Sequence, residues 1–169
     1  MTAALADERT VPIKALLDAF AVRARAYAHI FDVLRESFGP DRAVELLAEA
    51  TRRMGAAGAG PFAAFAPNDL AGLREAFLGS IPVADALFAP EVLREDADHL
   101  DIELHSCPLV SAWKQMGRSD EEIEQLCQGA RAVDRGLFTA AGFSFTAEGW
   151  KRDGHDRCRL HVVPGRTAG

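Results

Sequence analysis

The chain has 169 residues, of which 49% are hydrophobic and 26% are charged, a composition typical of one soluble globular domain with a core. The formal net charge is −6 and the basic residues are scattered, which excludes nucleic acid as an expected partner. No apolar run approaches the ~20 residues that span a bilayer. Residues 1–10 contain charges where a signal peptide has its apolar core, so we expect a cytoplasmic protein without a membrane partner.

The first half of the chain has the apolar spacing of helices. Residues 10–38 repeat apolar side chains at helical intervals, and a second helix is predicted over residues 41–55. The segment 55–67 is rich in Gly, Ala and Pro and predicts a mobile loop, because this composition favours turns over regular structure. Asn68 is then the expected N-cap of a short helix that ends near Leu78.

The spacing changes over residues 99–107, where apolar side chains alternate with polar and charged ones. This pattern predicts a half-buried strand with one polar face. A partner strand is expected to begin near Val92, with a turn at residues 96–98. Pro108 suits the first turn of a following helix, which is expected to end near Met116.

The last third of the chain predicts one further helix and a hairpin. Ser119 and Glu122 have the spacing of a capping box, and the helix that they open is expected to continue to Leu137. Residues 143–146 and 157–163 then have the alternation of two strands, which we expect to pair. The chain must reverse its direction between these two segments for them to pair.

These elements predict an α+β fold, with an N-terminal helical half followed by short antiparallel strands packed against two further helices. The helical half covers residues 10–55 and the α+β half residues 91–163 of a single domain, 1–163. Residues 153–154 are Asp-Gly, a turn signal within the terminal hairpin. The tail 164–169 is expected to be disordered.

The strongest candidate for chemistry is the sequence Glu103-Leu104-His105-Ser106-Cys107-Pro108. Alternation along a strand would bring Glu103, His105 and Cys107 to one side. A cysteine at a helix N-cap has a lowered pKa and is a stronger nucleophile, because the free N–H groups stabilise the thiolate. His105 would move protons and Glu103 would orient its ring. The alternative is that Cys107 is a buried structural thiol, since cysteine is among the most buried residue types.

Two other cysteines and one carboxylate accompany this motif. Cys127 and Asp134 are seven residues apart, which places them on one face of the predicted helix, with Asp134 turned inward. Taken alone, Cys127 reads as a core residue, and Cys158 reads as a cysteine on the apolar face of the last strand. An odd number of cysteines in a reducing compartment argues against a disulfide framework.

A zinc site formed by Cys107, Cys127, Cys158 and His105 is a chemically acceptable alternative. The four residues lack the short Cys-x-x-Cys spacing of most structural zinc sites. We therefore expect no bound metal and no cofactor.

Several segments in the second half carry a family resemblance. They are residues 105–109, 112–117, 121–127, 132–136 and 154–158. A weaker resemblance lies in the first half, at residues 49–55. The set has a Cys-Pro before a helix, a cysteine in the next helix followed by an aspartate, and a late Gly-x-x-x-Cys before a strand. In this order and spacing the chain resembles the L-2-amino-thiazoline-4-carboxylate hydrolase family.

The resemblance implies a hydrolase that opens a C–N bond in a small cyclic amidine or isothiourea. Cys107 would then be the nucleophile and His105 its acid–base partner, with Glu103 or Asp134 holding the imidazole or the amidine. The resemblance also implies substrate contacts for three residues, Trp113, Cys127 and Cys158. A cationic side chain is expected to meet the substrate's carboxylate, although the pattern does not identify it.

A second family shares the order of the cysteines. The chain is also similar to small-molecule-binding domains of the 4-vinyl-reductase type, which implies a sensory module whose cysteines are structural or bind metal. A homo-oligomer and a monomer are both compatible with the sequence. In either reading the partner is a small molecule.

Overall fold

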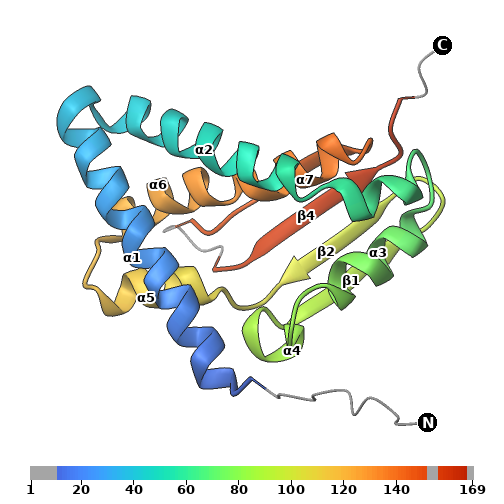
Figure 1. The fold of residues 1–169 in the computed structure, drawn as a ribbon, viewed down its shortest axis with the longest axis horizontal. Helices are drawn as coiled ribbons and strands as arrows, with labels where there is room; N and C mark the ends of the chain where they lie inside the picture. The colour runs from blue at the N-terminus through green and yellow to red at the C-terminus, as the bar shows by residue number, and fades with distance from the viewer. Residues whose placement is uncertain (1–10, 152–155, 167–169) are drawn as a thin grey trace, which may run out of the picture.

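The computed structural model of the protein describes residues 11–151 and 156–166. Two long helices come first, α1 (Ile13–Phe38) and α2 (Pro40–Ala57), which meet at Gly39 (Figure 1). Gly39 has a φ of 83°, in the left-handed region that glycine adopts without a steric penalty. The predicted helical half is confirmed.

Helix α1 turns one apolar stripe towards the rest of the molecule. Its buried positions are Ala24, Ala28 and Phe31, which follow helical spacing. The small side chains at the first two positions allow close approach of the neighbouring helix. Val22 and Val33, on the outer side of α1, remain more than half exposed. The inner stripe is therefore what anchors α1 to the core.

The segment after α2 is regular structure, so the prediction of a mobile loop over residues 55–67 is wrong. Its first three residues continue α2, and a 3-10 helix, η1 (Gly60–Phe65), follows. Phe62 is only 7% exposed and packs into the core. This single aromatic anchor offsets the turn-forming composition around it.

The next helix, α3 (Leu70–Gly79), begins one residue later than predicted. Asp69 is its N-cap in place of Asn68, and the carboxylate of Asp69 accepts a 2.9 Å hydrogen bond from the backbone N–H of Gly72. A single helical turn, α4 (Ala84–Leu87), then leads into the sheet.

Four strands form one antiparallel sheet in the order β1-β2-β4-β3. The strands are β1 (Pro90–Glu95), β2 (Leu100–Leu104), β3 (Ser144–Glu148) and β4 (Cys158–Val163). Both predicted strand pairs are present, and the pairing of β2 with β4 joins them. The α+β fold class, with helices before strands, is confirmed.

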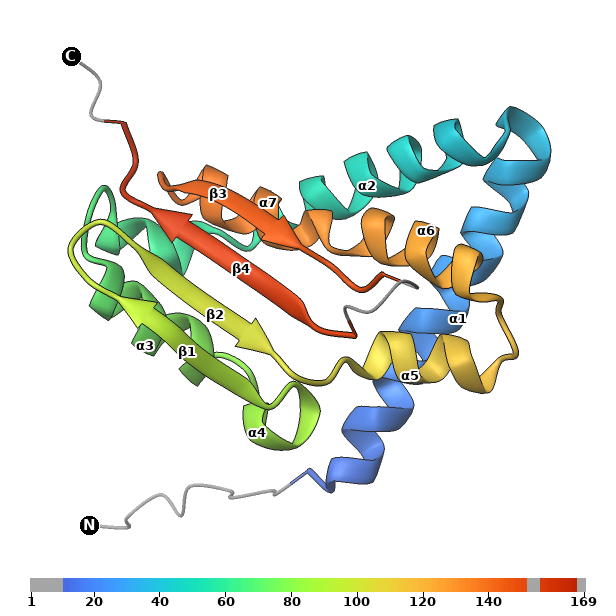
Figure 2. The ribbon, with the colours of Figure 1, turned by 180° about the vertical axis from the view of Figure 1, so that it is seen from behind.

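Alternation divides the sheet into two faces. Leu100 and Ile102 of β2, with Leu160 of β4, are buried beneath the helices. The opposite face lies in front in Figure 2, and no helix of the described chain crosses it there. On that face Asp101 and His161 form a 2.8 Å hydrogen bond between neighbouring strands. The polar alternate residues lie on this face, as the sequence pattern predicts, although Glu103 is buried there at 6% exposure.

Three helices occupy the second half, α5 (Pro108–Gln115), α6 (Asp120–Ala130) and α7 (Ala132–Ala140). The capping box of Ser119 is confirmed. The expected single helix from this cap to Leu137 is wrong, because the helix is interrupted at Arg131. There the backbone N–H of Asp134 donates to the Arg131 carbonyl, three residues back, as in a 3-10 turn.

Helices α2 and α7 pack backbone against backbone. A side chain at Gly55 of α2 would collide with the carbonyl of Val133, and one at Gly136 of α7 would collide with the carbonyl of Arg52. Only glycine permits this approach at both contact points. The paired glycines fix the position of α7, and with it that of Asp134.

The last described residues are also held in place. The backbone N–H of Gly165 donates a 2.8 Å hydrogen bond to the carbonyl of Pro67, so the expected disorder from Pro164 onwards is wrong for residues 164–166. The predicted turn at Asp153-Gly154 lies outside the described residues.

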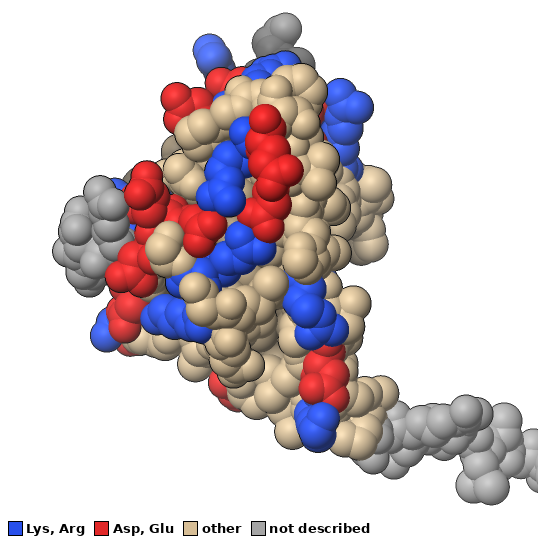
Figure 3. Space-filling view, turned by 90° about the vertical axis from the view of Figure 1, so that its left-hand side faces the viewer, with Lys and Arg blue, Asp and Glu red and all other residues tan. Residues whose placement is uncertain are grey.

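Acidic and basic side chains are intermixed on the surface. Figure 3 shows one such face, where neither sign forms a continuous patch. Some of these pairs are structural: Arg118 holds Asp32 of α1 through two hydrogen bonds of 2.6 and 2.7 Å. Within the described chain, no helix combines the length and the apolar character needed to cross a bilayer.

Candidate active site

A cavity of about 250 Å³ lies where the helices meet one end of the sheet. Its walls are mostly apolar and come from both halves of the chain. The lining residues are Phe20, Arg23, Phe77, Ile81, Phe88, Leu104, Cys107, Leu109, Val110, Trp113, Cys127, Ala130, Arg131, Val133, Asp134, Ala147, Glu148, Cys158 and Leu160. An apolar cavity with a few converging polar groups is the usual form of a small-molecule site.

Cys107 reaches the cavity from the start of α5. It is the N-cap of that helix, with extended backbone angles, and Pro108 occupies the first helical position, as predicted. Burial raises the pKa of its thiol to about 11, although the backbone N–H groups of Val110 and Leu109 oppose the rise. The expected lowering of this pKa is therefore wrong for the free protein, because desolvation outweighs the helix N-terminus.

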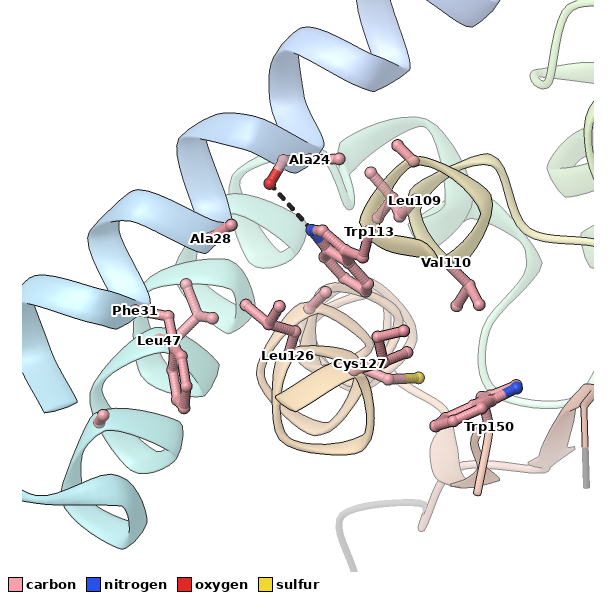
Figure 4. Close-up of a cluster of buried hydrophobic side chains, with 14 residues drawn as sticks. Ala24, Ala28, Phe31, Leu47, Leu109, Val110, Trp113, Leu126, Cys127 and Trp150 are labelled. Carbon is pink, nitrogen blue, oxygen red and sulfur yellow. Dashed lines mark hydrogen bonds between the residues drawn. The ribbon is translucent and has the colours of Figure 1, made fainter. Parts of the chain in front are cut away.

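Cys127 of α6 and Cys158 of β4 form a pair at the same cavity. Interaction of the two thiols lowers the pKa of Cys127 and raises that of Cys158, so the pair holds one proton more tightly than the other. In Figure 4 the sulfur of Cys127 points towards Trp150, another residue of the same core cluster. The fold thus gathers three thiols that lie 20 and 31 residues apart along the chain.

Two carboxylates line the cavity: Glu148 of β3 is exposed, with its Oε1 3.9 Å from His161, and Asp134 is half-buried. Asp134 lies on α7 and accepts no hydrogen bond or ion pair within the part of the chain that the structure describes. Burial raises its pKa to about 6, and the charge of Arg23 opposes this rise. Asp134 is half-buried, and a carboxylate shielded from much of the solvent without a partner favours a ligand that supplies one.

Arg23 and Arg131 bring positive charge to the cavity. Arg23 comes from α1, more than 80 residues from the nearest cysteine. Sequence reasoning missed it, although helical spacing from Phe20 and towards Tyr27 places it on the inner half of α1. That spacing was the available signal.

His105 and Glu103 are not brought to the cavity. Strand β2 ends at Leu104, so its alternation does not continue to Cys107. The carboxylate of Glu103 instead accepts from Arg157 at 2.9 Å and from Arg159 at 2.6 Å.

His105 also lies outside the cavity, beside two acidic residues. Its Nε2 is 2.7 Å from Glu91 and 3.7 Å from Glu103. Neither predicted partner of Cys107 therefore lines the cavity with it, whereas Asp134 does.

Trp113 is buried at 1% exposure and forms part of the inner wall. Its indole is fixed by a 2.9 Å hydrogen bond from Nε1 to the carbonyl of Ala24 (Figure 4). The predicted substrate contacts Trp113, Cys127 and Cys158 thus all face the cavity.

Among the described residues, the group of three possible metal ligands within 4.8 Å of one another is Glu91, Glu103 and His105, outside the cavity. The three cysteines do not form such a group. Glu103 is buried at 6% exposure and already ion-paired with Arg157 and Arg159, so this cluster is better described as an ion-pair network.

No match was found among curated proteins. The family described as L-2-amino-thiazoline-4-carboxylic acid hydrolase matches residues 19–162, a range that contains all the residues lining the cavity, the three cysteines among them. This match covers most of the sequence and both halves of the fold. The chain belongs to the L-2-amino-thiazoline-4-carboxylic acid hydrolase family.

Proposed function

We propose that the protein hydrolyses a small cyclic amidine or isothiourea, opening a ring C–N bond at the carbon that bears the amino group. The observation that carries the proposal is the meeting of Cys107 and Asp134 in one apolar cavity. A nucleophile and a carboxylate of raised pKa in a shielded site are the groups that such a reaction requires. The family membership supports hydrolysis as the reaction type.

Asp134 would first bind the protonated amidine. An amidinium is planar, positively charged and rich in N–H donors, and the carboxylate has no partner among the described residues. The attraction is strengthened by the apolar walls, because fewer water molecules screen the pair. A bound cation would also lower the pKa of the nearby Cys107 thiol, offsetting part of the effect of burial.

Cys107 would then attack the amidine carbon. In this step its sulfur bonds to the carbon while its proton passes to Asp134. Collapse of the tetrahedral adduct breaks the ring C–N bond, and Asp134 returns the proton to the departing nitrogen, which leaves as an amine. The cysteine remains attached to the former ring carbon.

Water completes the cycle. Asp134 takes one proton from the water as its oxygen bonds to the same carbon. The Cys107–carbon bond then breaks as the carbonyl forms, and the second water proton passes to the released amine. The proton held by Asp134 then returns to the sulfur. The net change is the addition of one water to the substrate, and His105 has no part in this scheme because it does not line the cavity.

The test is incubation of the purified protein with thiazolines, hydantoins and lactams, followed by mass spectrometry. We expect a cyclic amidine to gain the mass of one water. Amine- and thiol-reactive reagents then identify the broken bond, since C–N cleavage releases an amine and C–S cleavage a thiol. Cys107→Ala and Asp134→Asn should abolish turnover, and Asp120→Asn, at an exposed first-turn aspartate of α6 outside the cavity, serves as a matched control that retains it.

The apolar lining also favours a second candidate, a ligand-binding module without catalysis. Phe20, Phe77 and Phe88 offer surface for a hydrophobic ligand. Tight binding of such a ligand, with no turnover of any cyclic compound, would support this candidate over the hydrolase.

A further inference from the structure

We infer that Arg23 is the residue that selects a carboxylate-bearing substrate, by binding that carboxylate through its two terminal nitrogens. The inference rests on the proposed function, because it concerns the same cavity and the same class of cyclic amidine. It assigns to the N-terminal helix a part in substrate choice.

The guanidinium of Arg23 is held in a fixed orientation. Its Nε donates a 2.9 Å hydrogen bond to the hydroxyl of Tyr27, and that hydroxyl donates in turn towards the sulfur of Met54 at 3.9 Å. The guanidinium carbon lies 5.1 Å from the ring centre of Tyr27 and 6.0 Å from that of Phe20. These contacts use the inner nitrogen and the π surface of the guanidinium, and none of them is a hydrogen bond from a terminal nitrogen.

The terminal nitrogens of Arg23 are left for another partner. No carboxylate oxygen of the described residues lies within 4 Å of them, although Arg23 is partly buried and lines the cavity. A planar guanidinium with one edge engaged presents its remaining donors as a fork that fits a carboxylate.

Arg131, the other arginine of the cavity, is placed for a different role. Its side chain passes so close to Gly149 that a Cβ there would lie 2.6 Å from its Nη1. Its charge contributes to the lowered pKa of Cys127, whereas the charge of Arg23 acts on Asp134. Arg131 therefore acts on the Cys127–Cys158 pair. Arg23 acts on Asp134, the side chain that would bind the cation of the substrate.

Of the four charged groups that line the cavity, Glu148 is exposed and Arg131 lies with the thiol pair, which leaves Asp134 and Arg23 to select the charges of the ligand. A cation beside Asp134 and an anion beside Arg23 would satisfy both groups within one small cavity. A neutral lactam or a simple cationic amidine satisfies at most one. The cavity should therefore prefer a zwitterion whose two charged groups are carried by a single small ring.

The test compares two ligands that differ only in the carboxylate, 2-amino-thiazoline-4-carboxylate and 2-amino-thiazoline. Calorimetric binding is measured in a Cys107→Ala background, and turnover is measured with Cys107 present. Arg23→Gln should weaken binding of the carboxylate compound by about 10- to 100-fold, as expected for loss of a charge-assisted bidentate pair. It should leave the affinity for 2-amino-thiazoline within about twofold, and KM should change more than kcat.

Arg25→Gln is the matched control, because Arg25 lies on the same helix with an exposed side chain. It should not alter either affinity. Arg23→Lys keeps the charge but not the fork, and should lose part of the preference, which provides a second variant should Arg23→Gln fail to fold. Equal affinity of the parent protein for the two ligands, or an equal loss for both in Arg23→Gln, would overturn the inference. Absence of turnover with the carboxylate preference intact would instead contradict only the hydrolase proposal.

Discussion

Trp113 donates a 2.9 Å hydrogen bond from its indole nitrogen to the backbone carbonyl of Ala24, and so ties α5 to α1 (Figure 4). The two helices bring very different groups to the cavity, Cys107 at the start of α5 and Arg23 next to the bonded carbonyl. The bond therefore fixes the candidate nucleophile relative to the candidate carboxylate-binding residue.

Trp113→Phe should lower the free energy of unfolding by about 1–2 kcal/mol, because a buried hydrogen bond and part of a buried ring are lost. Urea denaturation measures this change. Trp150→Phe is the matched control, since Trp150 is similarly buried and its indole donates no hydrogen bond to a described residue. A smaller loss in Trp113→Phe than in Trp150→Phe would contradict the importance of the bond to Ala24.

Gly136→Ala should destabilise the protein by about 2–3 kcal/mol, because the new methyl group meets the carbonyl of Arg52 on α2. Displacement of α7 should also move Asp134 and reduce turnover. The control is Gly79→Ala, at a helix end with open space around it, which should be neutral or slightly stabilising. Equal thermal stability of the two variants would show that α2 and α7 separate without cost.

Cys107 should react slowly with iodoacetamide in the free protein. With a pKa of about 11, only about one molecule in 10⁴ carries the thiolate at pH 7, and the rate should still rise above pH 9, where a free thiol has levelled off. Peptide mapping after labelling measures this rate. A cyclic amidinium that binds but is not turned over should raise this labelling rate as long as it leaves the thiol accessible, because its positive charge stabilises the thiolate. Fast labelling at pH 6 without ligand would mean that the thiol is not desolvated as the cavity implies.

Asp134 should make stability depend on pH in a direction unusual for a carboxylate. Its pKa is raised from 3.8 to about 6, so the folded state binds the proton more tightly than the unfolded state. Stability should consequently fall as pH rises from about 4 to 6 and stay level above that. At about 1.4 kcal/mol per pKa unit the full effect is about 3 kcal/mol.

Asp134→Asn should remove this dependence and be more stable than the parent protein at pH 7. Urea denaturation at pH 4, 5, 6 and 7 compares the two, and the difference should vanish near pH 4. Turnover by the parent should rise with an apparent pKa near 6, because the ionised carboxylate binds the cation. A parent protein that gains stability between pH 4 and 6 relative to Asp134→Asn would contradict the burial of this carboxylate.

The sequence by itself determined most of the elements and the class of the fold, but not η1 or the break between α6 and α7. Helical spacing predicted α1 and α2, alternation predicted β2 and β4, and Pro108 placed Cys107 at a helix start. These features are local, because the repeat of apolar residues along one segment reflects which side of that segment is buried. The order of motifs, taken together, was also sufficient to predict the family.

Only the tertiary structure decided which groups share the cavity. It separated His105 from Cys107 at the end of β2, brought Asp134 and Arg23 to one site, and buried Cys107 deeply enough to reverse the expected shift of its pKa. Each outcome depends on contacts between segments far apart in the chain. The burial and the electrostatic environment of a side chain are set by the sum of those contacts. The periodicity of one segment does not show which distant residues pack against it.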